Sequence, residues 1–339
     1  MRFSTSAFAP ACTSPNHCEA DPLRLYPDAS DGEAAVTRYR VFPGMELDYR
    51  DVHARACREL RDGSGERLEI HHCLEGRVEY RQNGRYFYLS PGDLAVARTS
   101  SLPPDSRFPT GHYHGITVTI DPAAAPECLS CILSDVEVRP AALMEKLCPG
   151  GTVFTARSSR RVKHVFSELY AVPEDIRKGY LKVKLLELLL FLSTLSPEDG
   201  QTPHGCTAAQ VSLAEQVKAR LLAESDRTLT LKSLSQQFNV SEAQIKSSFT
   251  GVYGMSPAAY TRSQRMHCAA ALLRETDRTV LDIACQFGYD NASKFARAFR
   301  DVIGVSPREY RAGAEYDSCA PQLGEKPVSL SDADVERRI

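Results

Sequence analysis

The sequence predicts an α+β protein in which strands come first and the C-terminal third is all helix. Three observations lead to this prediction. Short runs of alternating apolar and polar residues, separated by turn-forming residues, fill the first third, as is typical of strands. The apolar spacing changes to the helical period after residue 139. Finally, Phe, Gly, Ser-Pro and Tyr recur at an offset of 50 residues near the C-terminus, which indicates one supersecondary unit used twice.

Length and charge suggest at least two domains with different partners. A chain of 339 residues is long enough for two or three domains, each with its own core. The net charge of −2 is unevenly distributed. Residues 207–312 carry 14 Lys and Arg against 10 Asp and Glu, a net of +4, whereas the remainder carries 27 against 33, a net of −6. This asymmetry is expected if only one part of the chain meets phosphates.

The most apolar run, Leu185 to Leu195, is shorter than the roughly 18 residues needed to cross a bilayer. The N-terminus lacks the apolar core of a signal peptide. Eleven cysteines follow no disulfide-scaffold spacing, so we expect reduced thiols in a cytoplasmic protein without membrane contact. Cys128 and Cys131 form a lone C-x-x-C, and the sequence leaves its role open.

Residues 1–35 are rich in Pro, Ser and Asp and are predicted to be a disordered lead-in. Residues 36–138 contain several short strands with regular turns, typical of a small barrel or sandwich. Asn83-Gly84 between two such runs is a strong hairpin signal. The stretches HHCLEGRVEY and YLSPGDLAV, with the hairpin between them, resemble the cupin-like barrel found at the N-terminus of many bacterial regulators.

Enzymatic cupins bind a metal through a His-x-His pair, a following Glu and a later His. Here His71 and His72 are adjacent, so their side chains point to opposite faces of a strand and cannot readily chelate one ion. We therefore expect no catalytic residues, no metal and no cofactor. The barrel is predicted to hold an effector or to be purely structural. The candidate effector-binding residues are Tyr80, Tyr86, Tyr88, Arg98, His112 and His114.

Residues 139–195 have helical periodicity and are predicted to be a dimerisation or coupling segment. In the helix expected from Tyr180 to Leu195, leucines form one stripe. Spacing alone does not decide whether this stripe packs within the subunit or against a second copy. Residues 196–206 contain two Pro and two Gly and are predicted to be the linker between domains.

The repeated unit occupies residues 207–312. Each copy contains a short helix, a tight turn and a second helix, which is the helix-turn-helix arrangement. Asn239 occupies the turn position where the second copy has Gly288, and Asn tolerates the left-handed conformation. Ser241 is expected to cap the next helix. A long helix from Pro257 to Glu275 is expected to connect the copies.

Within the second copy, the segments IACQFGY, FARAFR and GVSPREYR resemble the DNA-binding domain of AraC/XylS-family transcriptional regulators. The resemblance covers about a hundred residues. It implies an all-α domain with two helix-turn-helix motifs on a connecting helix, reading adjacent major grooves about 34 Å apart. The positions expected to contact DNA are Gln244, Lys246, Ser247, Asn291, Ser293, Lys294 and Arg297. Arg297 is the leading candidate because Arg binds guanine O6 and N7 bidentately.

The sequence thus predicts a bacterial transcriptional regulator and no enzyme. Its expected partners are promoter DNA, a small-molecule effector, a second copy of the chain, and RNA polymerase if the protein is an activator. Two alternatives stay open: a cupin-type oxygenase or isomerase with an attached nucleic-acid-binding module, and an interaction protein that has lost DNA binding. Residues 313–339 are predicted to be a flexible tail. Effector identity, target sequence and direction of regulation are not determined by these residues.

Overall fold

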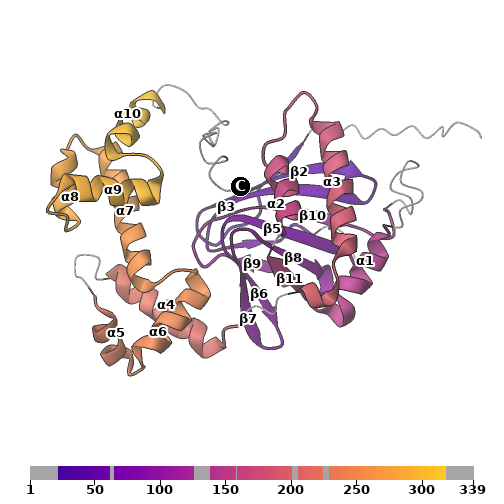
Figure 1. The fold of residues 1–339 in the computed structure, drawn as a ribbon, viewed down its shortest axis with the longest axis horizontal. Helices are drawn as coiled ribbons and strands as arrows, with labels where there is room; N and C mark the ends of the chain where they lie inside the picture. The colour runs from indigo at the N-terminus through magenta and orange to yellow at the C-terminus, as the bar shows by residue number, and fades with distance from the viewer. Residues whose placement is uncertain are drawn as a thin grey trace, which may run out of the picture. The chain divides into compact units, whose positions relative to one another are not determined.

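A computed structural model describes residues 22–61, 65–125, 138–157, 159–200, 205–223 and 229–317 (Figure 1). The N-terminal part is rich in β-sheet and the C-terminal part is helical, which confirms the predicted mixture of α and β structure. The described residues form two compact units. The first runs up to Lys218 and includes Leu231–Ser256, and the second comprises Ala219–Thr230 and the residues from Pro257 onward. Each unit is described separately below.

The main feature of the first unit is a seven-stranded antiparallel sheet in the order β1-β2-β3-β10-β5-β8-β11. Its strands are β1 (Leu23–Leu25), β2 (Glu33–Phe42), β3 (Met45–His53), β5 (Leu68–Gly76), β8 (Asp93–Arg98), β10 (Tyr113–Ile120) and β11 (Phe154–Arg157). Two smaller sheets consist of β4 (Ala56–Arg58) with β9 (Asp105–Arg107), and β6 (Val78–Gln82) with β7 (Arg85–Leu89). Short 3-10 turns lie at Thr99–Ser101, Pro149–Gly151 and Pro197–Asp199.

The predicted hairpin is confirmed. Gln82 pairs with Arg85 across the turn between β6 and β7. Asn83 has φ 50° and Gly84 has φ 72°, both in the left-handed region. A two-residue turn with positive φ at both positions matches the right-handed twist of its strands, which explains why Asn-Gly occurs here.

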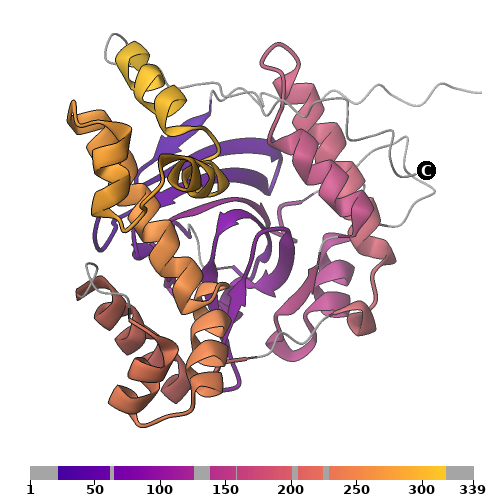
Figure 2. The ribbon, with the colours of Figure 1, turned by 60° about the vertical axis from the view of Figure 1, so that its left-hand side comes forward.

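Helices cover one face of the main sheet: α1 (Pro140–Leu147), α2 (Arg160–Leu169) and α3 (Arg177–Thr194). Figure 2 shows these magenta helices lying against the sheet. The leucine stripe of α3 is buried in the core beneath them, with Leu185, Leu188 and Leu189 each 0% exposed. Of the two roles left open by its spacing, the stripe therefore packs within the subunit. A second core, which includes Phe108 and Tyr113, lies on the other face.

The C-terminal helices are α4 (Ala208–Ala223), α5 (Leu231–Phe238), α6 (Glu242–Tyr253), α7 (Pro257–Glu275), α8 (Val280–Gln286), α9 (Ala292–Ile303) and α10 (Pro307–Asp317). The core of the second unit joins α7, α8 and α9 through residues that include Met266, Ile283 and Phe299. No described helix is long and apolar enough to cross a bilayer.

Three expectations from the sequence need correction. Residues 22–35, assigned to a disordered lead-in, contain β1 and the start of β2, because Leu23–Leu25 pairs with Val36–Arg38 of β2. Residues 313–317, assigned to a tail, continue α10. The end of the predicted linker is also held in place, since Cys206 and Tyr86 exchange backbone hydrogen bonds of 2.8 and 2.9 Å. Cys128 and Cys131 lie outside the described residues.

Candidate nucleic-acid interface

The first candidate reading element is α6, which follows α5 after a tight turn. Asn239 adopts φ 53°, the left-handed conformation expected for this position. The Ser241 hydroxyl accepts a 3.2 Å hydrogen bond from the Gln244 N–H, so the expected N-cap is present. Ile245 and Phe249 are fully buried and fix the inner face of α6. The helix therefore presents its opposite face to solvent.

That solvent face carries the predicted contact residues of the first copy. Gln244, Lys246 and Ser247 are all exposed. The Ser247 hydroxyl donates to the Gln244 carbonyl at 3.1 Å, which engages its hydrogen with the helix itself. Within the described chain, Lys246 forms no ion pair or hydrogen bond, so its ammonium group can meet a phosphate or a base edge.

The second candidate reading element is α9. A capping box between Thr279 and Asp282 begins α8, and the turn before α9 contains Gly288 with φ 80°. The Asn291 side-chain oxygen accepts a 2.7 Å hydrogen bond from the Ser293 N–H. This N-cap occupies the oxygen of Asn291 and leaves its NH₂ group, which is a hydrogen-bond donor, for a phosphate.

Lys294 and Arg297 lie one turn apart on α9 and share its exposed face with Ser293. Phe295 and Phe299, both 0% exposed, anchor the opposite face. Neither Lys294 nor Arg297 forms an ion pair with a described residue. Among the predicted contact residues, α9 therefore carries two cations without a described ion-pair partner and α6 carries one, so the second copy is the more basic candidate.

The residues predicted to bind an effector do not come together in one site. Tyr80 is buried and stacks edge-on with His71 at 5.8 Å between ring centroids. The Tyr88 hydroxyl donates to Glu79, and Tyr86 lies under the Arg81 guanidinium. The remaining three lie elsewhere: Arg98 is bound to Glu145 and to the Cys148 carbonyl, while His112 and His114 lie before and within β10.

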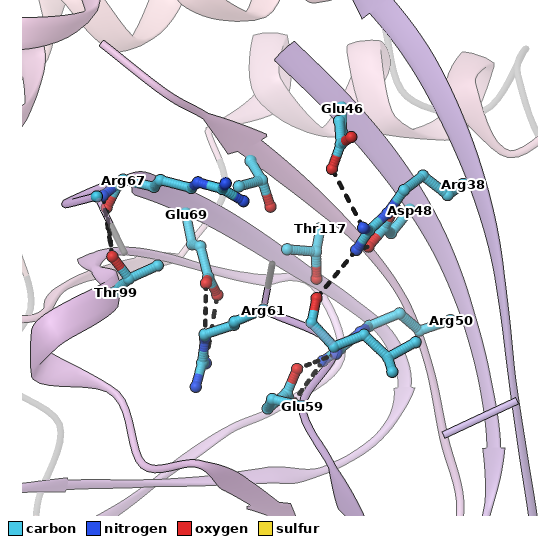
Figure 3. Close-up of a pocket in the computed structure, with 13 residues that line it drawn as sticks. Arg38, Glu46, Asp48, Arg50, Glu59, Arg61, Arg67, Glu69, Thr99 and Thr117 are labelled. Atoms are coloured by element: carbon cyan, nitrogen blue, oxygen red, sulfur yellow. Dashed lines mark hydrogen bonds and ion pairs between the residues drawn. The ribbon is translucent and has the colours of Figure 1, made fainter. Parts of the chain in front are cut away.

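A different set of side chains encloses a cavity of about 90 Å³ in the sheet region (Figure 3). Its charged lining consists of four arginines and four carboxylates: Arg38, Arg50, Arg61, Arg67, Glu46, Asp48, Glu59 and Glu69. None of the six predicted effector residues lines it. The sequence does contain a signal for this set, since Arg38 and Arg40 on β2 and Glu46, Asp48 and Arg50 on β3 alternate with other residues as one charged strand face would.

Ion pairs organise this cavity. Arg38 binds Asp48 with two hydrogen bonds of 2.9 Å, and Arg50 pairs with Glu59. Burial raises the pKa of Glu69, but hydrogen bonds and the positive charges of His71 and Arg61 outweigh it and lower that pKa to about 2. Among the described residues that line the cavity, Arg50 and Arg67 each keep a buried Nε atom without a hydrogen-bond partner. The cavity is therefore polar, its formal charges balance, and most of its charged groups bind one another.

His71 and His72 lie on opposite faces, as predicted. His71 Nδ1 is 3.1 Å from the Thr117 hydroxyl on the cavity side. His72 stacks on Phe166 of α2 at 4.0 Å and lies 3.2 Å from the Tyr170 hydroxyl. Burial lowers the pKa of His72 to about 4, so this imidazole is neutral at pH 7. The pair cannot bind a common ion.

A close junction between the sheet region and α6 has no signal in the sequence. Arg77, which directly precedes β6, donates to the Thr250 carbonyl in the last turn of α6 at 3.4 Å. A Cβ on Gly254 would approach Arg77 Nη1 to 2.5 Å, so only glycine permits this distance. From α4, Lys218 donates to the Pro109 carbonyl at 3.0 Å. These contacts connect the first helix-turn-helix copy directly to the sheet region.

Comparison with known proteins agrees with the geometry of the two helix pairs. Residues 234–313 match the family model of a helix-turn-helix domain. The transcriptional regulator Rob of Salmonella typhimurium is 32% identical over 93 residues, 27% of this chain and 32% of that protein. The chain thus spans about a third of the length of that relative.

Two further relatives cover more of their own length. The arabinose operon regulatory protein of Escherichia coli is 24% identical over 275 residues, 76% of this chain and 83% of that protein. A crystal structure of a probable AraC family transcriptional regulator from Rhodopseudomonas palustris is 30% identical, covers 30% of this chain and 97% of that chain, and has a TM-score of 0.29.

The matched residues 234–313 thus form a helix-turn-helix domain. The chain is similar to transcriptional regulators of the AraC/XylS family.

Proposed function

We propose that the protein binds a specific double-stranded DNA site by placing α6 and α9 in adjacent major grooves. The observation that carries this proposal is the pair of helices whose inner faces are anchored by buried Phe249 and Phe299 and whose outer faces carry Lys246, Lys294 and Arg297. A helix fits the major groove, and cations on its outer face reach bases and phosphates.

Footprinting with the full chain on DNA upstream of its own and neighbouring genes tests this proposal. We expect two protected stretches whose centres lie about 10 base pairs apart, one helical turn. A competitor duplex of random sequence at moderate salt separates specific from electrostatic binding. Protection that disappears equally with specific and random competitors would contradict sequence-specific recognition.

In this proposal the sheet region is a cupin-like regulatory barrel, and the cavity bounded by Arg38, Arg50 and Glu69 is its effector site. Ligand pockets for drug-sized molecules are about 300–1,000 Å³. A cavity of about 90 Å³ lined by balanced charges suits a small polar compound instead. The buried, unpaired Nε of Arg67 supplies a donor that such a compound would satisfy.

A thermal-shift screen of small polar compounds tests the effector site. A compound that binds the folded chain raises the unfolding midpoint with its concentration. We expect Arg67→Gln to abolish that increase, whereas substitution of Arg81 on the exposed hairpin leaves it intact. An increase that survives Arg67→Gln would place the effector elsewhere, including at the six residues expected from the sequence.

The junction between β6 and α6 is the proposed route from the barrel to DNA. Arg77 is buried and lies at the C-terminal end of α6, where the helix dipole is negative. Burial lowers the pKa of Arg77, although nearby Asp93 opposes this change. A shift of β6 upon effector binding would remove this cation from the Thr250 carbonyl and free α6 to reorient.

The relatives are regulators, which favours a non-enzymatic role over the alternative of a cupin metalloenzyme. The divergent faces of His71 and His72 also argue against the ligand set of enzymatic cupins. We further propose a cytoplasmic location and contact with RNA polymerase if the protein activates transcription. A homodimer would have to use a surface other than the buried stripe of α3.

A further inference from the structure

Three side chains with metal-binding atoms lie together at one end of the main sheet. Asp51 and His53 are in β3, and His114 is in the adjacent strand β10. Asp51 Oδ1 lies 3.0 Å from His53 Nε2 and 3.3 Å from His114 Nε2. The three donor atoms all lie within 4.8 Å of one another. One carboxylate oxygen therefore faces two imidazole nitrogens.

The strand register builds this cluster. Asp51 and His114 are direct partners in the antiparallel ladder between β3 and β10. His53 is two residues beyond Asp51, so its side chain points to the same face. The imidazole rings of His53 and His114 are 5.2 Å apart and nearly perpendicular. Because ladder hydrogen bonds fix both strands, the donors are already close without any ligand.

The cluster lies beyond the part of this face that the helices cover. The next pair on the same face of the ladder, Tyr49 and Ile116, packs into the core beneath α2, and the Tyr49 hydroxyl donates to the Leu169 carbonyl. In contrast, the Asp51 and His53 side chains are 59% and 61% exposed. None of the three belongs to the two hydrophobic cores described for the sheet.

We propose that Asp51, His53 and His114 form a binding site for a divalent first-row transition metal ion of the zinc class. Two imidazoles with one carboxylate suit Zn²⁺, Fe²⁺ or Ni²⁺, whereas Ca²⁺ and Mg²⁺ prefer oxygen ligands. With metal–ligand bonds of about 2.0–2.1 Å, two ligands at a tetrahedral angle are roughly 3.4 Å apart. The observed separations of 3.0 and 3.3 Å from Asp51 are close to this value.

The site leaves room for further ligands. Three protein donors leave at least one coordination position for water. The ladder with β5 also pairs His114 with exposed Glu75, which places a second carboxylate beside the site. The sequence predicted no metal because His71 and His72 point to opposite faces of one strand, and His114 was predicted to bind an effector. The inference does not depend on DNA binding.

Titration of the chelator-stripped, reduced full-length protein with Co²⁺ tests the site, with Zn²⁺ as competitor. We expect one Co²⁺ per chain with the visible bands of nitrogen and oxygen ligation. Asp51→Asn, which keeps the side-chain shape, and the double variant His53→Ala/His114→Ala should each weaken binding at least about 10-fold. Zn²⁺ should also raise the thermal unfolding midpoint of the unaltered chain and not that of the double variant.

The matched control is His164→Ala. His164 is 63% exposed and forms a similar 3.1 Å pair with Glu168 but lacks a third donor, so its loss should leave Co²⁺ binding unchanged. The chain also has eleven cysteines, whose thiolates bind the same ions. Thiolate charge-transfer bands that dominate the Co²⁺ spectrum, or equal affinity in the double variant, would overturn the proposal.

Discussion

At the scale of single residues, the proposed recognition of DNA depends on which helical cations lack a partner. Arg297 and Lys294 are exposed on α9, and the described chain offers them no carboxylate. Arg278, by contrast, donates to the Gln286 side chain and is occupied. A free guanidinium has five donors in a planar fork, which matches the two acceptors on the guanine edge.

The Arg297→Ala variant should bind its specific DNA site more weakly by about 1–3 kcal/mol and lose discrimination at one base pair. Fluorescence anisotropy with single-base variants of the footprinted site measures both effects. Arg160→Ala, which removes an exposed helical arginine in the sheet region, should change neither. Unchanged discrimination among the site variants would show that another residue reads that base.

His72 should make the stability of the protein sensitive to mild acid. Burial lowers its pKa from 6.5 to about 4 in the folded state. The unfolded chain therefore binds the proton first as the pH falls, so this contribution is full above about pH 6.5 and declines toward pH 4. At pH 5 the loss relative to pH 8 should be about 2 kcal/mol.

Urea unfolding of the unaltered chain and of His72→Asn at pH 8 and pH 5 measures this loss. The asparagine can still approach the Tyr170 hydroxyl but does not titrate, so its free energy of unfolding should fall less on acidification. The exposed-site variant His164→Asn should behave like the unaltered chain. Equal acid sensitivity in all three proteins would mean that His72 is not the responsible group.

At the scale of elements, the two repeated helix pairs, α5 with α6 and α8 with α9, have shared and distinct parts. The glycine that recurs at an offset of 50 ends the second helix in both copies, with φ 76° at Gly254 and 92° at Gly304. Only a residue without Cβ adopts this left-handed cap freely. Gly254 also allows the approach of Arg77, and nothing lies within 4 Å of the corresponding position on Gly304.

Replacement of Arg77 by Met should loosen α6 from the sheet region. The variant keeps much of the side-chain volume but loses the bonds to the Thr250 and Tyr88 carbonyls. Hydrogen exchange of the last turn of α6 should accelerate by an amount corresponding to about 1–3 kcal/mol. Arg81→Met, on the strand β6 that follows Arg77, is the control. Unchanged exchange in Arg77→Met would exclude the junction as a coupling element.

The leucine stripe of α3 should contribute to folding and not to association. Leu185 is 0% exposed in the core beneath α3, so Leu185→Ala should lower the free energy of unfolding by about 2–5 kcal/mol. Val183, 61% exposed on the same helix, serves as the control, and Val183→Ala should be nearly neutral. Urea unfolding gives the stability and native mass spectrometry the oligomeric state. If Leu185→Ala abolished a dimer without lowering the free energy of unfolding, the stripe would belong to an interface.

At the scale of the whole molecule, charge is segregated along the chain. The net charge is −2, yet residues 207–312 are basic by four charges. A duplex would therefore be attracted by one region and repelled by the rest. The affinity for DNA should therefore depend on local contacts with phosphates and not on the overall charge of the chain.

Binding should consequently weaken steeply with salt despite the acidic total. The logarithm of the association constant should fall linearly with the logarithm of salt concentration, by about 0.9 for each phosphate that is neutralised. Lys294→Ala should reduce this slope by about 1 if Lys294 contacts a phosphate. Anisotropy over a salt series measures the slope. If the unaltered chain and Lys294→Ala gave the same slope, Lys294 would contact a base or make no contact with DNA.

Local rules determined much of the structure in advance. The sequence predicted α7 with the bounds that are observed, and Asn-Gly predicted the β6–β7 hairpin. The left-handed turn at Asn239 and the cap at Ser241 followed from side-chain chemistry alone. These features depend on neighbours within four residues, which the sequence displays directly.

Tertiary structure decided the features that join distant residues. The sequence could not show that Arg50 meets Glu59, that Cys206 pairs with Tyr86, or that Arg77 reaches the end of α6. It also missed the meeting of His114 with Asp51, 63 positions earlier, because strand register brings them together. Helices and turns follow from local conformational preference, whereas cavities, junctions and metal-binding clusters follow from the pairing and packing of whole elements.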